Sequence, residues 1–216
     1  MAERREVDPE RPEPAVVAAA VRELASGGLV ALPTETFYGL AARADDERAL
    51  ARLDGLKGRE GAGPLLLLVA DGTMAAALAR ALPPAFAALA AAFWPGPLTL
   101  VLPARAGLPA AVRGPTGGVG LRVPGLALPR AIARGLGGAI TGTSANRHGV
   151  PPATTAAAVA AAFPEGLALV LDGGACPGGA PSTLLDLTGP RPRLLREGRI
   201  AAAALRPYLG GFDGAL

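Results

Sequence analysis

Ser144 and Asn146 stand in the stretch TSANRHG (143–149), which follows a predicted strand and leads into a proline-rich loop. A hydroxyl and an amide at the carboxyl end of a strand can contact a nucleotide, because open α/β sheets bind ligands there. An Asx or ST turn is the alternative, although such a turn needs only one of the two residues. His148 is the only histidine, but no GxSxG turn accompanies it. We therefore expect it to be structural or solvent-facing, not part of a catalytic triad.

Lys57 and Arg59 flank a glycine in LKGRE (56–60), at the predicted end of a helix. Of the 21 lysine and arginine residues, Lys57 is the only lysine. Its survival in an arginine-rich chain is a weak sign that this position requires a lysine. Cations at a helix C-terminus also stabilise the helix dipole. The pattern favours a phosphate or carboxylate clamp, in which a bidentate arginine lies beside a compact ammonium.

Two hydroxyls, Thr34 and Thr36, alternate around Glu35 in PTETFYGL (33–40), directly after a buried strand. At a strand end, such hydroxyls can grip a small polar ligand. They can equally cap the backbone of their own turn. Spacing alone favours neither interpretation over the other.

Arg122 lies inside the apolar strand GLRVP (120–124). A half-buried guanidinium needs an anionic partner, either from the protein or from a ligand. Ser182 lies in the glycine-rich loop DGGACPGGAPST (172–183), which has neither a Walker ending nor dinucleotide-binding spacing. Arg196 is a second strand-borne arginine, in LLREG (194–198).

These residues need a scaffold that brings several strand ends together. The patterns predict helices and strands in mixed order, an α/β fold with a mixed sheet. Predicted strands cover 29–33, 64–70, 98–103, 119–124, 139–143, 167–172, 182–188 and 192–197, and predicted helices cover 14–26, 47–58, 127–136, 154–163 and 200–209, with alanine-rich helices before Phe93. Asp45 or Asp46 is the expected N-cap of the second helix. Residues 1–13 are predicted to form a loose N-terminal arm, and residues 14–216 a single domain.

Composition limits the classes of protein to consider. The 216 residues are 50% hydrophobic, enough for one sizeable core. A net charge of +3 and a pI of about 9.7 suit anionic small molecules or RNA, or reflect arginine in place of lysine. The single Cys176 excludes an internal disulfide and a cysteine zinc cluster, and no set of residues has metal-ligand spacing. Neither a signal peptide nor a membrane span is recognisable, so we expect a soluble, cytoplasmic protein without membrane contact.

Taken in order, several stretches resemble the YrdC/TsaC family, the threonylcarbamoyl-adenylate synthases of tRNA modification. The matching pieces are LPTETFYGL, KGR followed by PLLLLV, WPGPLTLVLP, VGLRVP, TSAN, PSTLLDLT and LLREG, between about residues 28 and 200. The resemblance implies a single YrdC-like domain with a twisted mixed sheet and flanking helices around a basic cavity. It also implies conversion of L-threonine, bicarbonate or CO2 and ATP into threonylcarbamoyl-AMP and pyrophosphate. The extra C-terminal domain of longer members is not expected, because the chain ends at residue 216.

Carried over residue by residue, the family's functional positions fall into two groups. The L-threonine group is Thr34, Thr36, Arg122 and Ser182, and the ATP group is Lys57, Arg59, Ser144, Asn146, Thr154 and Arg196. Lys57 and Arg59 are the expected catalytic pair. Mg²⁺ is expected to arrive with the nucleotide, and no protein-bound transition metal is expected. The expected partners are the threonylcarbamoyl transferase of tRNA modification and, by direct contact, tRNA or double-stranded RNA.

A second hypothesis is a non-synthase YrdC-like paralogue that binds nucleotide or RNA through the same cavity. Glu60, Gly63 and Leu68 favour it, because the family usually carries other residues there: a subset has histidine at the position of Leu68. The intact KGR and SAN motifs favour the synthase. A third reading, a carbamoyl-handling domain of a hydrogenase-maturation protein, would need zinc-finger and acylphosphatase-like segments that the chain lacks.

Overall fold

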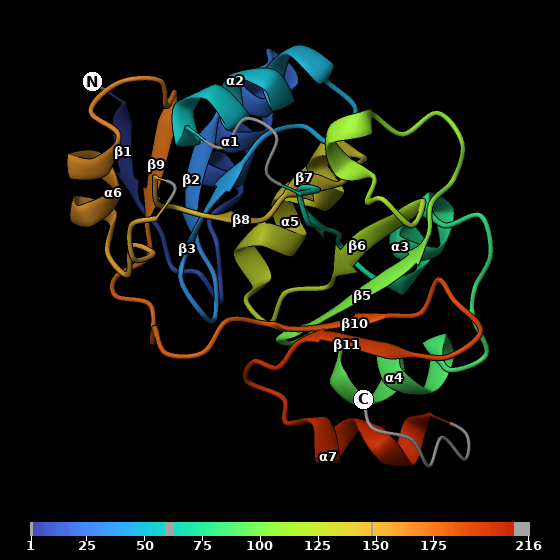
Figure 1. Ribbon diagram of the computed structural model, residues 1–216. Helices are drawn as coiled ribbons and strands as arrows, with labels where there is room; N and C mark the ends of the chain where they lie inside the picture. Colours follow the sequence, from blue (N-terminus) through green and yellow to red (C-terminus); the bar gives the residue numbers. More distant parts are fainter. Residues whose placement is uncertain (1, 59–62, 148, 210–216) are drawn as a thin grey trace.

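The computed structural model describes residues 2–58, 63–147 and 149–209, whose strands form two β-sheets surrounded by helices (Figure 1). The first sheet has the order β1 (Glu3–Glu6), β9 (Leu169–Asp172), β2 (Val30–Pro33), β3 (Tyr38–Ala41) and β8 (Thr143–Ser144). The second has the order β11 (Arg193–Arg196), β10 (Thr183–Asp186), β5 (Leu98–Pro103), β6 (Gly118–Arg122), β4 (Leu67–Leu68) and β7 (Ile140–Thr141). Both sheets combine parallel and antiparallel pairs. The predicted mixed α/β class is confirmed, although the strands divide between two sheets.

The helices and short 3₁₀ turns lie around these sheets. They are α1 (Pro14–Ala25), α2 (Glu47–Lys57), α3 (Gly72–Leu78), α4 (Phe86–Phe93), η1 (Ala110–Val112), α5 (Ala127–Leu136), α6 (Ala156–Ala162), α7 (Ala202–Leu205) and η2 (Arg206–Tyr208). Helices α1 and α5 pack together and bury apolar side chains against β2 and β9. A larger core includes buried residues of both sheets and so joins them. In the described part of the chain, no helix is both long and apolar enough to span a bilayer.

The N-terminal segment is not the loose arm that the sequence predicts. Strand β1 pairs in parallel with β9, in register from Glu3 opposite Leu169 to Glu6 opposite Asp172. The Arg4 guanidinium also forms an ion pair with the Asp172 carboxylate. The prediction is wrong for these residues because β9 has an open edge whose backbone groups can take a further strand.

The last residue of helix α2 is Lys57, the only lysine of the chain. The N-cap of the helix is Asp46, one of the two residues that the sequence predicts for this role. The Asp46 carboxylate accepts hydrogen bonds from the backbone N–H groups of Arg48 and Ala49. The helix ends at Gly58, which has a φ of 62° and so adopts the left-handed conformation that stops a helix. Lys57 therefore occupies the last helical position, where its orientation is fixed by the helix.

The predicted strand 139–143 is divided between the two sheets. Ile140–Thr141 forms β7 in the second sheet, and Thr143–Ser144 forms β8 in the first. Gly142 lies between them, and a Cβ at this position would come within 2.6 Å of the Leu68 side chain. A residue without a side chain thus allows the chain to pass over Leu68. The SAN segment begins at this crossing.

Candidate functional site

A cavity of about 840 Å³ is lined by residues of both sheets, and most of the predicted site residues meet there. The predicted residues in its lining are Thr34, Thr36, Lys57, Arg122, Ser144, Asn146, Ser182 and Arg196. They come from segments separated by more than a hundred positions in the sequence, so only the fold brings them together. Arg59 falls outside the described residues.

Thr154 is the described member of the predicted set that does not line the cavity. Its carbonyl accepts the backbone N–H of Cys176 at 2.7 Å. Its methyl group lies 3.3 Å from the place where a Cβ on Gly178 would stand. Gly178 in turn donates its N–H to the carbonyl of Thr36 at 2.9 Å. Thr154 is thus one contact behind the cavity wall, and its assignment to ATP stays a prediction.

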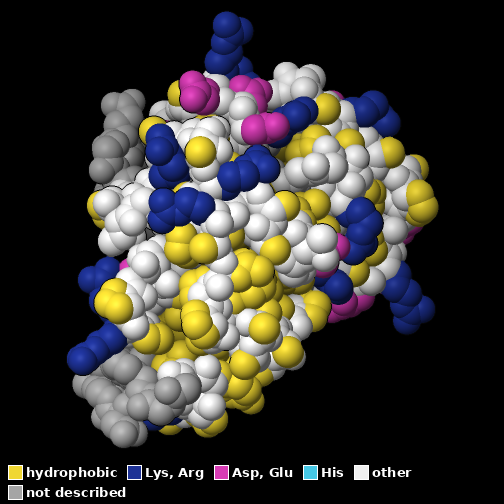
Figure 2. Space-filling view, turned by 90° about the vertical axis from the view of Figure 1, so that its right-hand side faces the viewer, with side chains coloured by type: hydrophobic (Ala, Val, Ile, Leu, Met, Phe, Trp, Pro, Cys, Tyr) yellow, Lys and Arg dark blue, Asp and Glu magenta, His cyan; other side chains and the backbone are white. Residues whose placement is uncertain are grey.

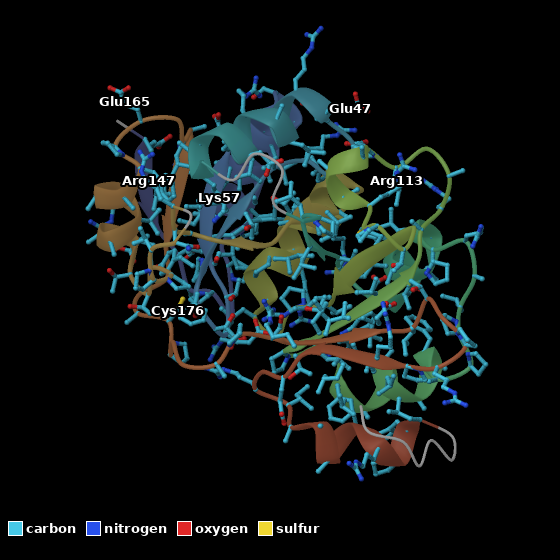
Figure 3. All side chains as sticks on the ribbon, in the orientation of Figure 1. Glu47, Lys57, Arg113, Arg147, Glu165 and Cys176 are labelled. Atoms are coloured by element: carbon cyan, nitrogen blue, oxygen red, sulfur yellow. The ribbon has the colours of Figure 1, made fainter. Side chains whose placement is uncertain are left out.

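The Lys57 side chain is 5% exposed and points from the end of α2 to the SAN segment (Figure 3). Its Nζ donates to the carbonyl of Ser144, to the carbonyl of Asn146 at 2.7 Å and to Oδ1 of Asn146 at 3.3 Å. The single lysine and the single asparagine of the chain are therefore in direct contact. A compact ammonium with three donors suits this group of oxygens.

The SAN segment is a braced turn as well as part of the cavity wall. The Ser144 hydroxyl donates to Oδ1 of Asn146. The Asn146 amide donates to the carbonyls of Val150 at 2.7 Å and Arg147 at 3.1 Å. The turn and the ligand-binding interpretations are thus compatible, because the same side chains shape the loop and line the cavity. His148 lies outside the described residues.

The PTETF segment forms the connection between β2 and β3. The Thr34 hydroxyl lies 3.0 Å from the Thr36 hydroxyl and donates to the carbonyl of Phe37 at 2.7 Å. It also accepts the backbone N–H of Thr36 at 3.2 Å. Both threonines are buried yet line the cavity, so the hydroxyl pair has a fixed position at its wall.

Arg122 has the anionic partner that its burial requires, and that partner is Glu35. Nη2 of Arg122 lies 2.5 Å from Oε1 of Glu35, and Nε donates to the carbonyl of Gly96 at 3.2 Å. The ion pair lacks the alignment of a hydrogen bond, so this buried Nη2 has no hydrogen-bond acceptor among the described residues. Arg122 also lines the cavity, so its guanidinium is placed to meet an anionic ligand there. Burial raises the pKa of Glu35, but the charge of Arg122 and the N–H of Gly125 outweigh it, so the pKa is lowered.

Ser182 and Arg196 form a second cluster on the same wall. The Ser182 hydroxyl lies 2.9 Å from that of Thr99 on β5, a cavity residue that the sequence did not single out. Arg196 donates to the Ser182 carbonyl through Nε at 3.2 Å and Nη2 at 3.0 Å. Both Arg122 and Arg196 line the cavity, and burial together with the like charge of Arg122 lowers the pKa of Arg196.

Sequence reasoning also missed an ion pair in the lining. Asp186 on β10 is 2% exposed and accepts a hydrogen bond from Arg193 on β11 at 2.8 Å. Its other oxygen accepts from the hydroxyl and N–H of Thr188. Burial raises the pKa of Asp186, but these hydrogen bonds outweigh it and lower the pKa. The pairing of β10 with β11 creates this contact, and no spacing rule in the sequence reveals it.

The floor of the cavity is apolar and depends on glycines. Cβ atoms at Gly118 and Gly120 would come within 2.5 Å of Val101 and 2.4 Å of Leu66, respectively. These aliphatic side chains therefore lie flat over the strands, where they line the cavity together with Leu68. The floor can take the apolar surface of a ligand, while the walls supply the polar groups.

The charge of the described lining is mainly positive. Lys57, Arg122, Arg193 and Arg196 face one carboxylate, Asp186, and several hydroxyls. Such a lining suits a polyanionic ligand together with a small polar one. Within the described ranges, no group of three or more histidine, cysteine or acidic residues is placed to hold a metal ion.

Comparisons with known proteins point to one family. The Sua5–YciO–YrdC family model, described as Telomere recombination, matches residues 22–198. The threonylcarbamoyl-AMP synthase of Pyrococcus abyssi is 37% identical over 195 residues, which cover 90% of this chain and 56% of the relative. That of Chromohalobacter salexigens is 39% identical over 171 residues, which cover 79% of this chain and 92% of the relative. The chain thus spans little more than half of the archaeal relative and most of the bacterial one.

Solved structures agree with this result. P. abyssi Sua5 complexed with L-threonine has a TM-score of 0.90 and 36% identity, covering 96% of this chain and 61% of that chain. E. coli YciO has a TM-score of 0.85 at 22% identity and covers 95% of this chain and 100% of that chain. The second likeness concerns the fold alone, because its sequence identity is low.

Proposed function

The chain belongs to the Sua5–YciO–YrdC family, and on that premise we propose that it is an L-threonylcarbamoyladenylate synthase. It converts L-threonine, bicarbonate or CO2 and ATP into threonylcarbamoyl-AMP and pyrophosphate. The observation that carries the proposal is the shared cavity, where Lys57 contacts the SAN segment and Arg122 lines the wall.

The chemistry accounts for this set of side chains. The threonine amine adds to CO2 to give a carbamate, and a carbamate oxygen bonds to the α-phosphorus as the bond to pyrophosphate breaks. Two anions must meet, so cations are needed to offset their repulsion and the charge that develops on the leaving pyrophosphate. We assign this role to Lys57 and Arg59. Fixed positioning of both substrates supplies much of the remaining rate enhancement, without a histidine base.

The two substrates share the cavity, and we place Arg196 where their sites meet, because it contacts Ser182. We place the ATP phosphates near Lys57, Arg59, Ser144, Asn146 and Arg196, with Thr154 in support. We place L-threonine near the Thr34 and Thr36 hydroxyls and Ser182, with its carboxylate on Arg122. The position of Arg122 in the cavity lining supports this placement, because a guanidinium can pair with a carboxylate.

Mg²⁺ enters this scheme with the nucleotide. The one acidic residue in the described lining, Asp186, already accepts from Arg193 and Thr188. The protein oxygens left for a cation are hydroxyls and carbonyls, which fit an ion that is held mainly by phosphates. Bound there, Mg²⁺ would offset phosphate charge.

The product defines the partners that we propose. Threonylcarbamoyl-AMP is an activated mixed anhydride, so it must be passed to a transferase that modifies tRNA. This handover places the protein in the cytoplasm with tRNA. Direct contact with tRNA or double-stranded RNA is a further part of the proposal.

The alternative is a non-synthase paralogue that binds nucleotide or RNA through the same cavity. Gly63 and Leu68 both line the cavity and favour it: Gly63 departs from the residue that the family often has, and Leu68 stands where a subset has histidine. Glu60 lies outside the described residues. The face of the molecule in Figure 2 does not favour the RNA-binding form of this alternative. On the face in Figure 2, most lysine and arginine side chains lie in the upper half among acidic ones, and hydrophobic side chains cover much of the lower half. This face has no uninterrupted basic surface of the kind that nucleic acids bind.

Pyrophosphate release tests the proposal. With ATP and bicarbonate present, release should require L-threonine, because its carbamate is the nucleophile. Equal release without threonine would indicate an ATPase or another acceptor. ATP binding without turnover for any amino acid would favour the paralogue.

A further inference from the structure

Glu35 connects two segments that border the amino-acid end of the cavity. It lies in the β2–β3 connection between Thr34 and Thr36, and its side chain is 17% exposed. Oε1 of Glu35 lies 2.5 Å from Nη2 of Arg122 and accepts the backbone N–H of Gly125 at 2.9 Å. One carboxylate thus joins the threonine turn to β6 and to the segment that follows it.

Glu35 itself does not belong to the cavity lining, whereas both neighbouring threonines and Arg122 do. It therefore reaches the guanidinium from behind the wall. A Cβ on Gly125 would stand 3.3 Å from the Glu35 carboxyl carbon, so the backbone approaches the carboxylate closely. The acid can act on a substrate only through the groups that it holds.

The charges explain why an acid is needed here. Arg122 is 7% exposed and lines the same cavity as a second cation, Arg196, whose pKa is lowered by burial and by the charge of Arg122. Without Glu35, the lining would hold both guanidinium groups with no carboxylate beside Arg122. With Glu35, the charge of Arg122 is offset from behind the wall, while the Arg122 side chain still lines the cavity.

We propose that Glu35 is a positioning residue that fixes the Arg122 guanidinium and the Thr34–Thr36 hydroxyls as one unit for L-threonine. The inference rests on the proposed function, since it assumes that threonine occupies this end of the cavity. It assigns to Glu35 an effect on threonine binding and none on the nucleotide phosphates.

The test compares Glu35→Gln and Glu35→Asp with the wild-type chain. Calorimetry measures the threonine Kd, and pyrophosphate release measures KM for threonine and for ATP. Glu35→Gln keeps the side-chain volume but loses the charge, so both threonine constants should rise at least about tenfold. Glu35→Asp keeps the charge but shortens the side chain by one methylene, so the threonine Kd and KM should rise less than in Glu35→Gln. The ATP KM should change less than about twofold in both.

Asp45→Asn is the matched control, because Asp45 forms an ion pair with Arg43 on the surface and does not line the cavity. It should leave all three constants unchanged. Thermal unfolding of each variant separates folding from binding. If Glu35→Gln does not fold, the charged Glu35→Asp decides the question.

Three outcomes overturn parts of the scheme in different ways. Wild-type threonine affinity in both Glu35 variants overturns the positioning role alone. Threonine and ATP constants that rise together, in step with a lower melting temperature, also overturn it and leave a purely structural ion pair. A wild-type chain that neither binds threonine nor releases pyrophosphate overturns the proposed function, and the role of Glu35 with it.

Discussion

The two walls of the cavity hold their cations by different means. On one wall, Lys57 donates to two backbone carbonyls and an amide oxygen of the Ser144–Asn146 segment. On the other, Arg122 faces the Glu35 carboxylate, and Arg196 contacts Ser182. Lys57 is thus oriented by the oxygens of a single loop. Arg122 is oriented by a charged side chain, Glu35, from the connection between two other strands.

This difference predicts how each wall fails. The wall formed by Lys57, Ser144 and Asn146, here called the lysine wall, depends on shape. An ammonium reaches three clustered oxygens that a broad, planar guanidinium cannot match. The wall that contains Arg122, Arg193 and Arg196, here called the arginine wall, depends on charge. Glu35 and Asp186 must stay ionised to hold Arg122 and Arg193. Size-changing substitutions should therefore affect the first wall most, and protonation the second.

The largest effect is expected for Lys57→Met, which removes the ammonium but keeps a long side chain. We expect kcat/KM for pyrophosphate release to fall at least about a hundredfold, or about 2.7 kcal/mol of transition-state stabilisation. Arg48→Met is the control, because Arg48 is an exposed cation on the same helix. Equal losses in both variants would remove the special role of Lys57.

Lys57→Arg separates shape from charge on the lysine wall. Twenty of the 21 basic residues are arginine, so a cation with no special requirement at position 57 should accept arginine. We expect the fold to persist and turnover to fall at least about tenfold, or roughly 1.4 kcal/mol. Turnover is measured at saturating ATP and threonine. A wild-type rate would show that the lone lysine is an accident of composition.

Asn146→Ala tests the loop side of the same contact. The side chain accepts from Lys57 and Ser144 and donates to Val150, so its removal loosens the loop and the cation together. We expect ATP affinity to fall by roughly 1 kcal/mol, since this is typical of one lost hydrogen-bonding group. Nucleotide titration and thermal unfolding distinguish the two effects. A strong fall in melting temperature with unchanged ATP affinity would favour the turn interpretation alone.

Much of the scaffold could be predicted because its signals are local. Asp46 caps α2 as a short polar side chain before an apolar periodic segment, and Gly58 ends it. The strand 98–103 coincides with β5. Strand β3 was not among the predicted strands. Its residues, Tyr38–Ala41, directly follow the hydroxyl-rich PTETF segment, so they read as part of the same turn.

The pairings within the site could not be predicted, because they are set by strand register and by contacts between distant segments. Burial of Arg122 indicated that an anionic partner was required, yet its partner Glu35 lies 87 positions earlier in the chain. Asp186 meets Arg193 only because β10 and β11 form a hairpin. The rarity of lysine did point to Lys57, and the place of the SAN motif after a strand pointed to Asn146, but neither signal revealed their direct contact.

The smallest effect is the loss of stability in acid, and of the two walls it should concern the arginine wall. The pKa values of Glu35 and Asp186 are lowered in the folded chain, because arginine contacts and hydrogen bonds outweigh the effect of burial. A lowered folded pKa means that the unfolded chain binds more protons in this range. The stabilisation is therefore present above the unfolded pKa of about 4 and is lost as the pH falls through the folded pKa. Urea unfolding between pH 7 and pH 3 should show a shallower acid loss for Asp186→Asn than for the wild type, whereas Lys57→Arg should keep the wild-type slope. Equal slopes for Asp186→Asn and the wild type would show that the arginine wall is not held by an ionised Asp186.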